Sequence, residues 1–195
     1  MPAMNVGIYI YDEAEVMDFS GPFEVFSVAS RFLPAAERFR VLLIGEAPVV
    51  SARGGFRVET HCRIDDHPPL DILVVVGGVH GAELKKPRVL DWIRTIASGA
   101  RQVASVCTGA FILAEAGVLT TQRVTTHWED IAELRGAYPL LEVVEGRRWV
   151  DDAIVTSAGI SAGIDMSLYL VAKLGSPELA ARTARQMEFD WTLPG

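Results

Sequence analysis

Cysteine is scarce in this chain, which has 195 residues and two cysteines, Cys62 and Cys107. The two could form one disulfide in principle, but they do not make the disulfide framework of a small secreted domain. The chain also has no CxxC pair, no histidines paired at helical ligand spacing and no Walker-type glycine loop. These absences argue against a metal site and a nucleotide site, so we expect no metal and no cofactor.

Long apolar runs and an excess of basic residues are also missing. No segment is long and apolar enough to span a bilayer, and Met1–Met4 lacks the basic start and apolar core of a signal peptide. The net charge is −7, so the surface as a whole does not attract nucleic acid. We therefore expect a cytoplasmic protein with neither a membrane nor a nucleic-acid partner.

Half of the residues are hydrophobic, which is enough for one sizeable core, and the length favours a single domain over residues 1–195. Strand-like and helix-like segments alternate along the chain. The predicted strands are Asn5–Tyr11, Phe39–Gly45, a hairpin of Val49–Ser51 and Phe56–Thr60, Asp71–Val76, the run from Gln102 to Cys107, Arg123–His127, Leu141–Val144 and Trp149–Val155.

The predicted helices are Ser20–Phe32, with Ser20 as cap after an acidic loop, then Pro87–Ser98, Ala110–Ala116, Glu129–Arg135, Ile164–Leu174 and a last helix from the cap Ser176 to about Met187. Such alternation favours an α/β fold with a mainly parallel sheet covered by helices on both faces. Ligands of such sheets bind beyond the carboxyl ends of the strands. We expect Asp18, Gly77, Gly78 and Cys107 at that edge.

Cys107 lies at the joint between a buried strand and a helix. Ser105 and Gly109 flank it at even spacing, as a sharp strand-to-helix turn requires, because bulk at either position would strike the backbone. The N-terminus of the following helix would favour the thiolate over the thiol. We interpret Cys107 as a catalytic nucleophile; the alternative is a buried cysteine that acts only as a small hydrophobe.

A cysteine nucleophile needs donors for developing charge and a group that moves protons. The backbone N–H groups of Gly78 and Thr108 are candidate donors. Asp18 has apolar neighbours, so a desolvated carboxyl group there would keep its proton and share it with the thiolate. The alternative is an ordinary carboxylate at a helix N-terminus. His127 is a second candidate base, and His80 lies near the Gly77–Gly78 turn, although a lone histidine more often has a structural role.

Several motifs together resemble one known superfamily. They are Asp18–Phe26, Gly77–Gly78, Ser105–Ala110, Ala114–Leu119, Thr125–Trp128, Thr156–Gly159 and Ala162–Asp165. In this order, over nearly the whole chain, they are similar to the ThiJ/PfpI superfamily, whose fold is like that of class I glutamine amidotransferases. Within it, they most resemble the isocyanide hydratases and the amidotransferase-like sensor domains of AraC-type regulators.

The resemblance implies a flavodoxin-like, three-layer α/β sandwich and a homodimer with its site near the subunit interface. It implies a hydratase that needs no cofactor, in which the Cys107 thiolate attacks the terminal carbon of an isocyanide and Asp18 relays the proton. Water then releases an N-substituted formamide from the thioimidate. Gly78 and Thr108, with Gly77 beside them, would orient the substrate.

Two alternatives belong to other classes of function. The first is a small-molecule sensor or regulatory domain, related to the AraC-type sensors; we expect no helix-turn-helix domain, because the chain ends at Gly195. The second is a stress-related protein whose thiolate is oxidised or attacks reactive carbonyls. The protease, glyoxalase and deglycase activities of the superfamily are disfavoured, because Thr108 stands where those proteins have a histidine after the cysteine.

Overall fold

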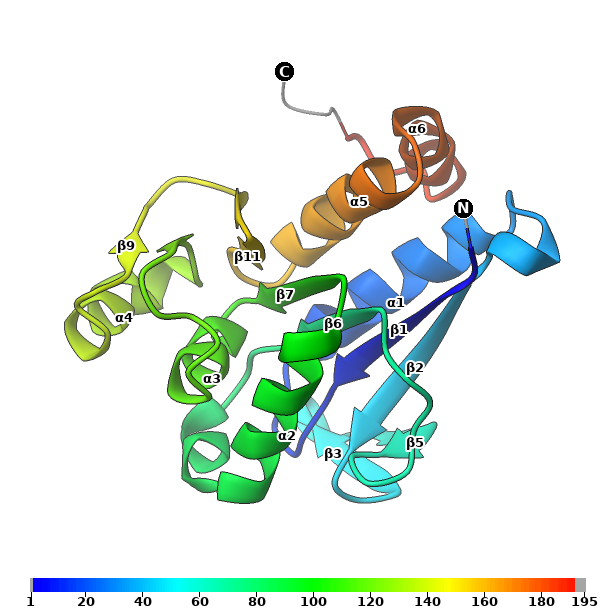
Figure 1. Ribbon diagram of the computed structural model, residues 1–195. Coiled ribbons are helices and arrows are strands. Elements are labelled where there is room, and N and C mark those ends of the chain that lie inside the picture. The colour runs from blue at the N-terminus through cyan, green and yellow to red at the C-terminus, as the bar shows by residue number, and fades with distance from the viewer. Residues whose placement is uncertain (1, 192–195) are drawn as a thin grey trace.

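The computed structural model describes residues 2–191, and its framework is a seven-stranded sheet (Figure 1). The strands lie across the sheet in the order β10-β11-β7-β6-β1-β2-β5. They are β1 (Met4–Tyr9), β2 (Phe39–Gly45), β5 (Cys62–Arg63), β6 (Ile72–Val75), β7 (Gln102–Val106), β10 (Trp149–Asp152) and β11 (Ile154–Ser157). Neighbours pair in parallel except β10, which runs antiparallel to β11. The prediction of a mainly parallel sheet is confirmed.

Two small sheets stand outside this framework. β3 (Val49–Ala52) and β4 (Phe56–Glu59) form an antiparallel hairpin, closed by the 3-10 turn η2 (Arg53–Gly55), as predicted. β8 (Arg123–Val124) and β9 (Glu142–Val143) pair in parallel.

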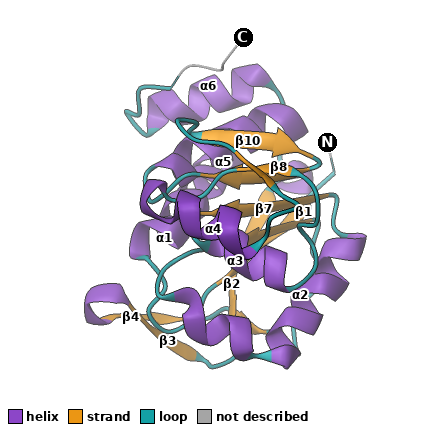
Figure 2. Ribbon diagram, turned by 90° about the vertical axis from the view of Figure 1, so that its left-hand side faces the viewer, coloured by secondary structure: helices purple, strands orange, loops and turns teal. Residues whose placement is uncertain are grey.

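Helices cover both faces of the large sheet, which gives the predicted three-layer, flavodoxin-like sandwich (Figure 2). The α-helices are α1 (Val16–Ser30), α2 (Pro87–Gly99), α3 (Gly109–Glu115), α4 (Ile131–Ala137), α5 (Ala162–Leu174) and α6 (Pro177–Gln186). The remaining 3-10 helices are η1 (Ala35–Glu37), η3 (His80–Lys85) and η4 (Trp128–Asp130). α1, α5 and α6 pack together on one face, and α2, α3 and η3 pack on the other. Within residues 2–191, no helix is long and apolar enough to cross a bilayer.

The three central strands of the sheet, β1, β6 and β7, bring the loops that follow them to one edge. β6 lies between β1 and β7, and all four of its residues, Ile72–Val75, are buried because both faces of a parallel strand are covered. β1, β6 and β7 are mutually parallel, so their carboxyl ends reach the same edge. The segments that follow them, 12–15, 77–79 and Cys107, therefore come together, as the sequence predicted.

The first helix begins earlier than predicted. The expected acidic loop Asp12–Asp18 ends at Glu15, the N-cap, and α1 starts at Val16, so Ser20 is an interior residue. Pro22 misled the prediction, because proline usually stands in the first turn, whereas here it lies inside the helix. Asp18 thus occupies the first turn, where the positive end of the helix dipole favours a carboxylate.

The late strands are also arranged differently. The glycine at position 146 predicts a turn that joins the strands Leu141–Val144 and Trp149–Val155, but the β9 segment of the first pairs with β8 instead. The second run is itself a hairpin of β10 and β11, because Ala153 takes a positive φ of 61° and reverses the chain. A local sequence pattern does not reveal such a reversal at an alanine.

Several boundaries shift for identifiable reasons. The predicted strand Arg123–His127 is only β8, because Thr125 N–H donates to the Thr156 hydroxyl and Thr126 Oγ1 donates to the Cys107 carbonyl. These bonds replace the ladder bonds of a longer strand. The small residues of Thr156–Gly163 predict a loop, but Thr156 itself lies in β11.

Smaller differences concern the helix ends and faces. α5 starts at Ala162, two residues before the prediction, and Cys62–Arg63 forms the short strand β5, which was not predicted. The spacing of apolar residues in α2 predicts that Leu90, Ile93, Ile96 and Ala97 face inward. Ile93 is buried, together with Val89, while the other three residues are half-buried.

The end of the chain follows the sequence closely. Ser176 caps α6 by accepting a hydrogen bond from the Leu179 N–H at 3.1 Å, as predicted. Of the domain predicted over residues 1–195, residues 1 and 192–195 lie outside the described part of the chain.

Candidate active site

Cys107 stands at a strained turn between β7 and α3. Its φ is 56°, in the left-handed region that an L-residue with a side chain seldom adopts. Gly109 makes this turn possible, because a Cβ at that position would overlap the Val75 carbonyl of the neighbouring strand. Ser105 is fully buried on the other side. The sharp turn predicted from the spacing of small residues is therefore present.

Hydrogen bonds from two other segments hold the turn in place. The Cys107 N–H donates to the carbonyl groups of Ser157 and Ala158 at 3.2 and 3.3 Å. The Cys107 carbonyl accepts from Thr126 Oγ1 at 2.8 Å. Strain of this kind persists only where the surroundings over-determine the backbone, and these bonds do so.

Asp18 lies beneath the cysteine and is fully buried. Its Oδ2 accepts the Gly77 N–H at 3.0 Å, while its Oδ1 has no hydrogen-bond partner among the described residues. The Cys107 thiol and the Ile160 N–H lie close enough to stabilise the charged carboxylate. A buried, unpartnered carboxylate oxygen beside a thiol can take up and return a proton.

Burial raises the pKa of Asp18 to about 7, although the Gly77 N–H opposes this shift. Burial also raises the pKa of the Cys107 thiol to about 12, and the neighbouring Asp18 charge acts in the same direction. The upward direction of the Asp18 pKa shift agrees with the prediction that a desolvated carboxyl group there keeps its proton. The prediction that the resting cysteine is a thiolate is wrong, because desolvation outweighs the N–H groups of Thr108 and Ile160.

The two predicted N–H donors differ in their availability. The Thr108 N–H faces the cysteine sulfur and lowers the pKa of the thiol. The Gly78 N–H instead donates to Thr108 Oγ1 at 3.0 Å, and that hydroxyl donates back to the Gly78 carbonyl at 3.1 Å. The expectation that both groups are free is thus wrong for Gly78, whose N–H is occupied by a side chain that the sequence did not place there.

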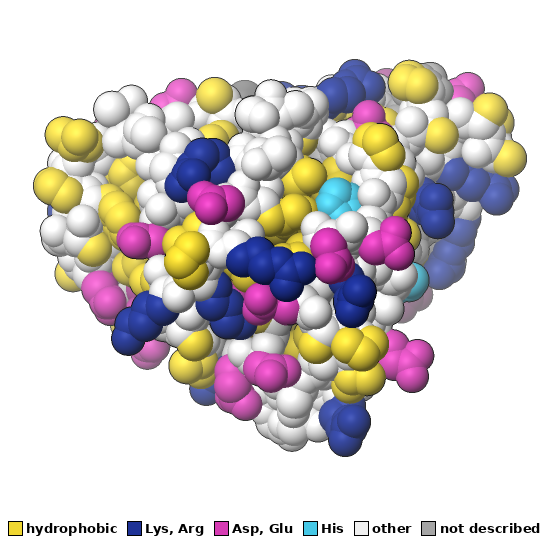
Figure 3. Space-filling model, turned by 60° about the horizontal axis from the view of Figure 1, so that its bottom comes forward, with side chains coloured by type: hydrophobic (Ala, Val, Ile, Leu, Met, Phe, Trp, Pro, Cys, Tyr) yellow, Lys and Arg dark blue, Asp and Glu magenta, His cyan; other side chains and the backbone are white. Residues whose placement is uncertain are grey.

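A cavity of about 340 Å³ opens above Cys107. Four of the residues singled out in the sequence line it with the cysteine: Gly78, His80, Thr108 and His127. Gly77 lies behind the wall, where a Cβ would strike Thr108, and Asp18 lies below the floor. Figure 3, in which the side where β1 and β2 end comes forward, shows a hollow with a histidine and charges of both signs around it.

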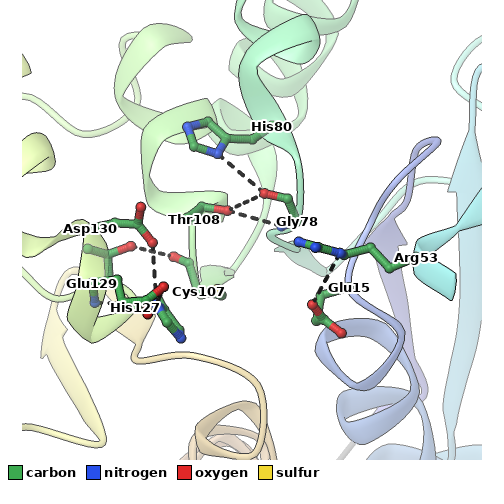
Figure 4. Close-up of polar contacts among 10 residues, drawn as sticks. Glu15, Arg53, Gly78, His80, Cys107, Thr108, His127, Glu129 and Asp130 are labelled. Atoms are coloured by element: carbon green, nitrogen blue, oxygen red, sulfur yellow. Dashed lines mark hydrogen bonds and ion pairs between the residues drawn. The ribbon is translucent and has the colours of Figure 1, made fainter.

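His127 belongs to one wall of the cavity. It is the N-cap of η4, where its Nδ1 accepts the Glu129 N–H at 3.3 Å and lies 3.4 Å from Asp130 Oδ2 (Figure 4). The edge of its ring packs so closely on Gly159 that a Cβ there would overlap it. His127 therefore reaches the cavity, and the cap bond occupies one of its nitrogens.

His80 belongs to the β6–η3 side. Its ring stacks on Phe111, with centroids 4.6 Å apart, and its Nδ1 lies 3.4 Å from the Gly78 carbonyl. These contacts tie the start of η3 to α3 and hold the Gly78 loop over the cysteine.

Several other cavity residues were not identified from the sequence. Arg53 and Glu15 come from the hairpin turn and the helix cap, and their charged groups lie 3.8 Å apart. Ile160 has a positive φ of 54°, which nothing in the surrounding small-residue run identifies. Arg53 stood beside a visible Gly-Gly turn, but only the tertiary pairing brings that turn to the site.

The described residues, 2–191, contain no cluster of three or more histidine, cysteine or acidic side chains able to hold a metal ion. Cys62 and Cys107 are both free thiols, so the disulfide considered from the sequence does not form.

Comparison with known proteins finds relatives that are similar in sequence and in fold. The profile described as the DJ-1/PfpI family matches residues 4–173. The isonitrile hydratase of Pseudomonas putida is 33% identical over 192 residues, which cover 96% of this chain and 79% of that protein. A THiJ/PfpI family protein from Pseudomonas syringae has a solved structure that matches with a TM-score of 0.86 at 25% identity, covering 100% of this chain and 78% of that one.

A transcriptional regulator is similar to the same degree. The HTH-type regulator CdhR of Pseudomonas aeruginosa is 33% identical over 171 residues, which are 88% of this chain and 51% of the regulator. The chain thus spans about half the length of that relative.

Proposed function

The chain belongs to the DJ-1/PfpI family, and from that premise we propose that it is a cysteine-dependent hydratase that converts isocyanides to N-substituted formamides. The observation that carries the proposal is the buried Asp18 carboxylate, with a free oxygen, beside the Cys107 thiol on the floor of an open cavity. The similarity to isonitrile hydratase supports the choice of substrate.

The reaction begins with a thiol, because burial keeps Cys107 protonated near neutral pH. Asp18, with a pKa of about 7, accepts the thiol proton as the sulfur attacks the terminal carbon of R–N≡C. Asp18 then returns this proton to that carbon. The product is the thioimidate R–N=CH–S–Cys107, in which every atom of thiol and isocyanide is retained.

Water completes the cycle. It adds to the thioimidate carbon, a proton reaches the nitrogen, and the C–S bond breaks to give R–NH–CHO and the thiol. The Thr108 N–H faces the sulfur and stabilises charge that develops on it. The net change is addition of one water to the isocyanide.

The test is turnover of a simple alkyl isocyanide, followed as formamide formation. We expect the wild type to be active, Cys107→Ala to be inactive and Cys62→Ala, which removes the other free thiol, to be unaffected. A wild type that makes no formamide while its Cys107 is reduced and accessible would overturn the proposal.

A second candidate, a ligand-sensing domain, is favoured by the high pKa of the resting thiol and by the similarity to CdhR. A sensor binds a small molecule without consuming it. Calorimetry that detects stoichiometric binding of an isocyanide, without formamide production, would favour this candidate. Selective conversion of Cys107 to sulfinic acid by mild peroxide would instead favour a stress-related thiol protein.

We also propose that the protein is a homodimer that pairs close to the cavity. Three exposed apolar side chains support this: Val79 and Ile160 line the cavity, and Met17 is exposed in the first turn of α1. A second copy would remove these side chains from water. Because the reaction needs a reduced thiol and both cysteines are free, we propose the cytoplasm as its location, which cell fractionation would test.

A further inference from the structure

Arg53 presents to the cavity a guanidinium whose N–H groups are not used in hydrogen bonds within residues 2–191. Its guanidinium donates no hydrogen bond to any described residue, and its contact with a charged group is the loose 3.8 Å approach of Nε to Glu15 Oε2. Its side chain is half exposed and lines the cavity opposite His127 and Asp130 (Figure 4). A guanidinium with its donors free at a cavity wall is suited to bind a carboxylate through two parallel hydrogen bonds.

The backbone of Arg53 is fixed relative to the reactive sulfur. The Arg53 N–H donates to the Ala14 carbonyl at 3.0 Å, and Ala14 forms a bridge with Gly78. The Val79 N–H donates to the Glu13 carbonyl at 3.0 Å. The hairpin turn, the cap of α1 and the Gly78 loop are thus joined by main-chain bonds, so the backbone that carries the Arg53 side chain is held at the opening of the cavity.

The other charges around the cavity leave this role to Arg53. Asp130 Oδ2 lies 3.4 Å from His127 Nδ1, and Glu129 is largely exposed to solvent. Glu15 faces Arg53 without a hydrogen bond and raises the pKa of Asp18. A ligand carboxylate that engages Arg53 would compete only with water and this loose contact.

We propose that Arg53 selects substrates that carry a carboxylate a short distance from the carbon that Cys107 attacks. This inference rests on the proposed hydratase function. It narrows the substrates of the hydratase to small isocyanides that carry a carboxylate, and their products are N-formyl amino acids. Recognition of the carboxylate does not depend on hydration, because the Arg53 guanidinium would attract the carboxylate of any electrophile that reaches the Cys107 sulfur.

The first experiment therefore uses alkylation. Iodoacetate and iodoacetamide are matched in size and differ in charge; with either, the sulfur bonds to the methylene carbon and iodide leaves with the C–I electron pair, while the thiol proton passes to solvent. Peptide mass spectrometry gives the ratio of the two rates at Cys107, with the urea-unfolded protein as reference. We expect this ratio to fall three- to tenfold in Arg53→Met and to fall less in Arg53→Lys.

The matched control is Arg57→Met, which removes an exposed arginine of the same hairpin that does not line the cavity. It should leave the ratio unchanged. An equal ratio in wild type and Arg53→Met, with both folded by circular dichroism, would overturn carboxylate recognition.

The second experiment measures hydration of isocyanoacetate and of its methyl ester. We expect kcat/KM for the acid to fall three- to tenfold in Arg53→Met while kcat/KM for the ester stays within twofold. If the wild type hydrates neither compound but the alkylation ratio depends on Arg53, the hydratase proposal fails and the carboxylate site stands. If the ester is hydrated and kcat/KM for the acid is the same in wild type and Arg53→Met, the proposed substrate class is wrong but the hydratase proposal is supported.

Discussion

At the scale of single residues, two buried groups share the chemistry. Asp18 and Cys107 are each pushed towards their neutral form by burial; the Asp18 charge further disfavours the thiolate, while the protonated Cys107 thiol stabilises the Asp18 carboxylate. The two groups together therefore tend to keep a proton between them. Such a pair suits a proton relay better than a preformed thiolate. This interaction predicts opposite effects of one substitution on two reactions.

Asp18→Asn should slow hydration at least 100-fold, because the amide cannot take the thiol proton. The same change removes a negative charge next to the sulfur, so the pKa of Cys107 should fall. Each unit of that fall raises the thiolate fraction tenfold, and we expect alkylation by iodoacetamide at pH 8 to become about tenfold faster. Parallel rate measurements on both reactions check this; a loss of both rates would indicate a structural role for Asp18.

Asp18 should also make stability depend on pH. Its pKa rises from 3.8 to about 7 on folding, so its protonated form stabilises the fold fully below about pH 4. This contribution, up to ~4 kcal/mol, is lost as the pH rises through 7. Urea denaturation from pH 4 to 8 should therefore show a decline in wild type that is absent from Asp18→Asn. Parallel pH profiles for the two proteins would contradict the assigned shift.

At the scale of elements, the site depends on how closely β7, its turn and α3 approach β6. The turn at Cys107 fits because Gly109 offers no side chain to the Val75 carbonyl. The loops after β1 and β6 are joined to the hairpin by main-chain hydrogen bonds. Small changes in backbone packing should thus alter the site more than changes in surface side chains.

Gly109→Ala should destabilise the protein by at least about 2 kcal/mol, because the new Cβ must push β6 and α3 apart. Gly136→Ala is the control, since Gly136 lies in α4 with no atom within 4 Å of its added Cβ. Alanine there should be neutral or stabilise by up to about 1 kcal/mol. Urea midpoints measure both; equal effects would show that the approach to β6 is not tight.

At the scale of the whole molecule, the exposed apolar side chains of the cavity wall and of α1 predict how two copies meet. Met17 is 42% exposed next to the buried Asp18. Met17→Glu should weaken a dimer that pairs there, because it places a charge in a desolvated contact. Leu140→Glu changes a more exposed apolar residue between α4 and β9 and should have no effect. Light scattering at micromolar concentration distinguishes the outcomes, and a monomeric wild type would contradict the dimer.

The sequence by itself determined the layers, the parallel centre of the sheet and the joint at Cys107. These follow from hydrophobic runs, small residues and helix caps, which act over a few neighbours along the chain. Asp18, Gly77 and Gly78 could be assigned to one edge for the same reason, because strand direction alone decides at which edge a loop lies.

The tertiary structure alone decided the protonation of the site and its charged wall. Desolvation depends on everything packed around a group, so the high pKa of Cys107 could not follow from the helix beside it. Arg53 and Ile160 reach the cavity through pairing between distant segments and a positive φ, and neither leaves a pattern in the nearby sequence. Long-range packing, which local propensity does not encode, thus decides which proton moves and which substrate fits.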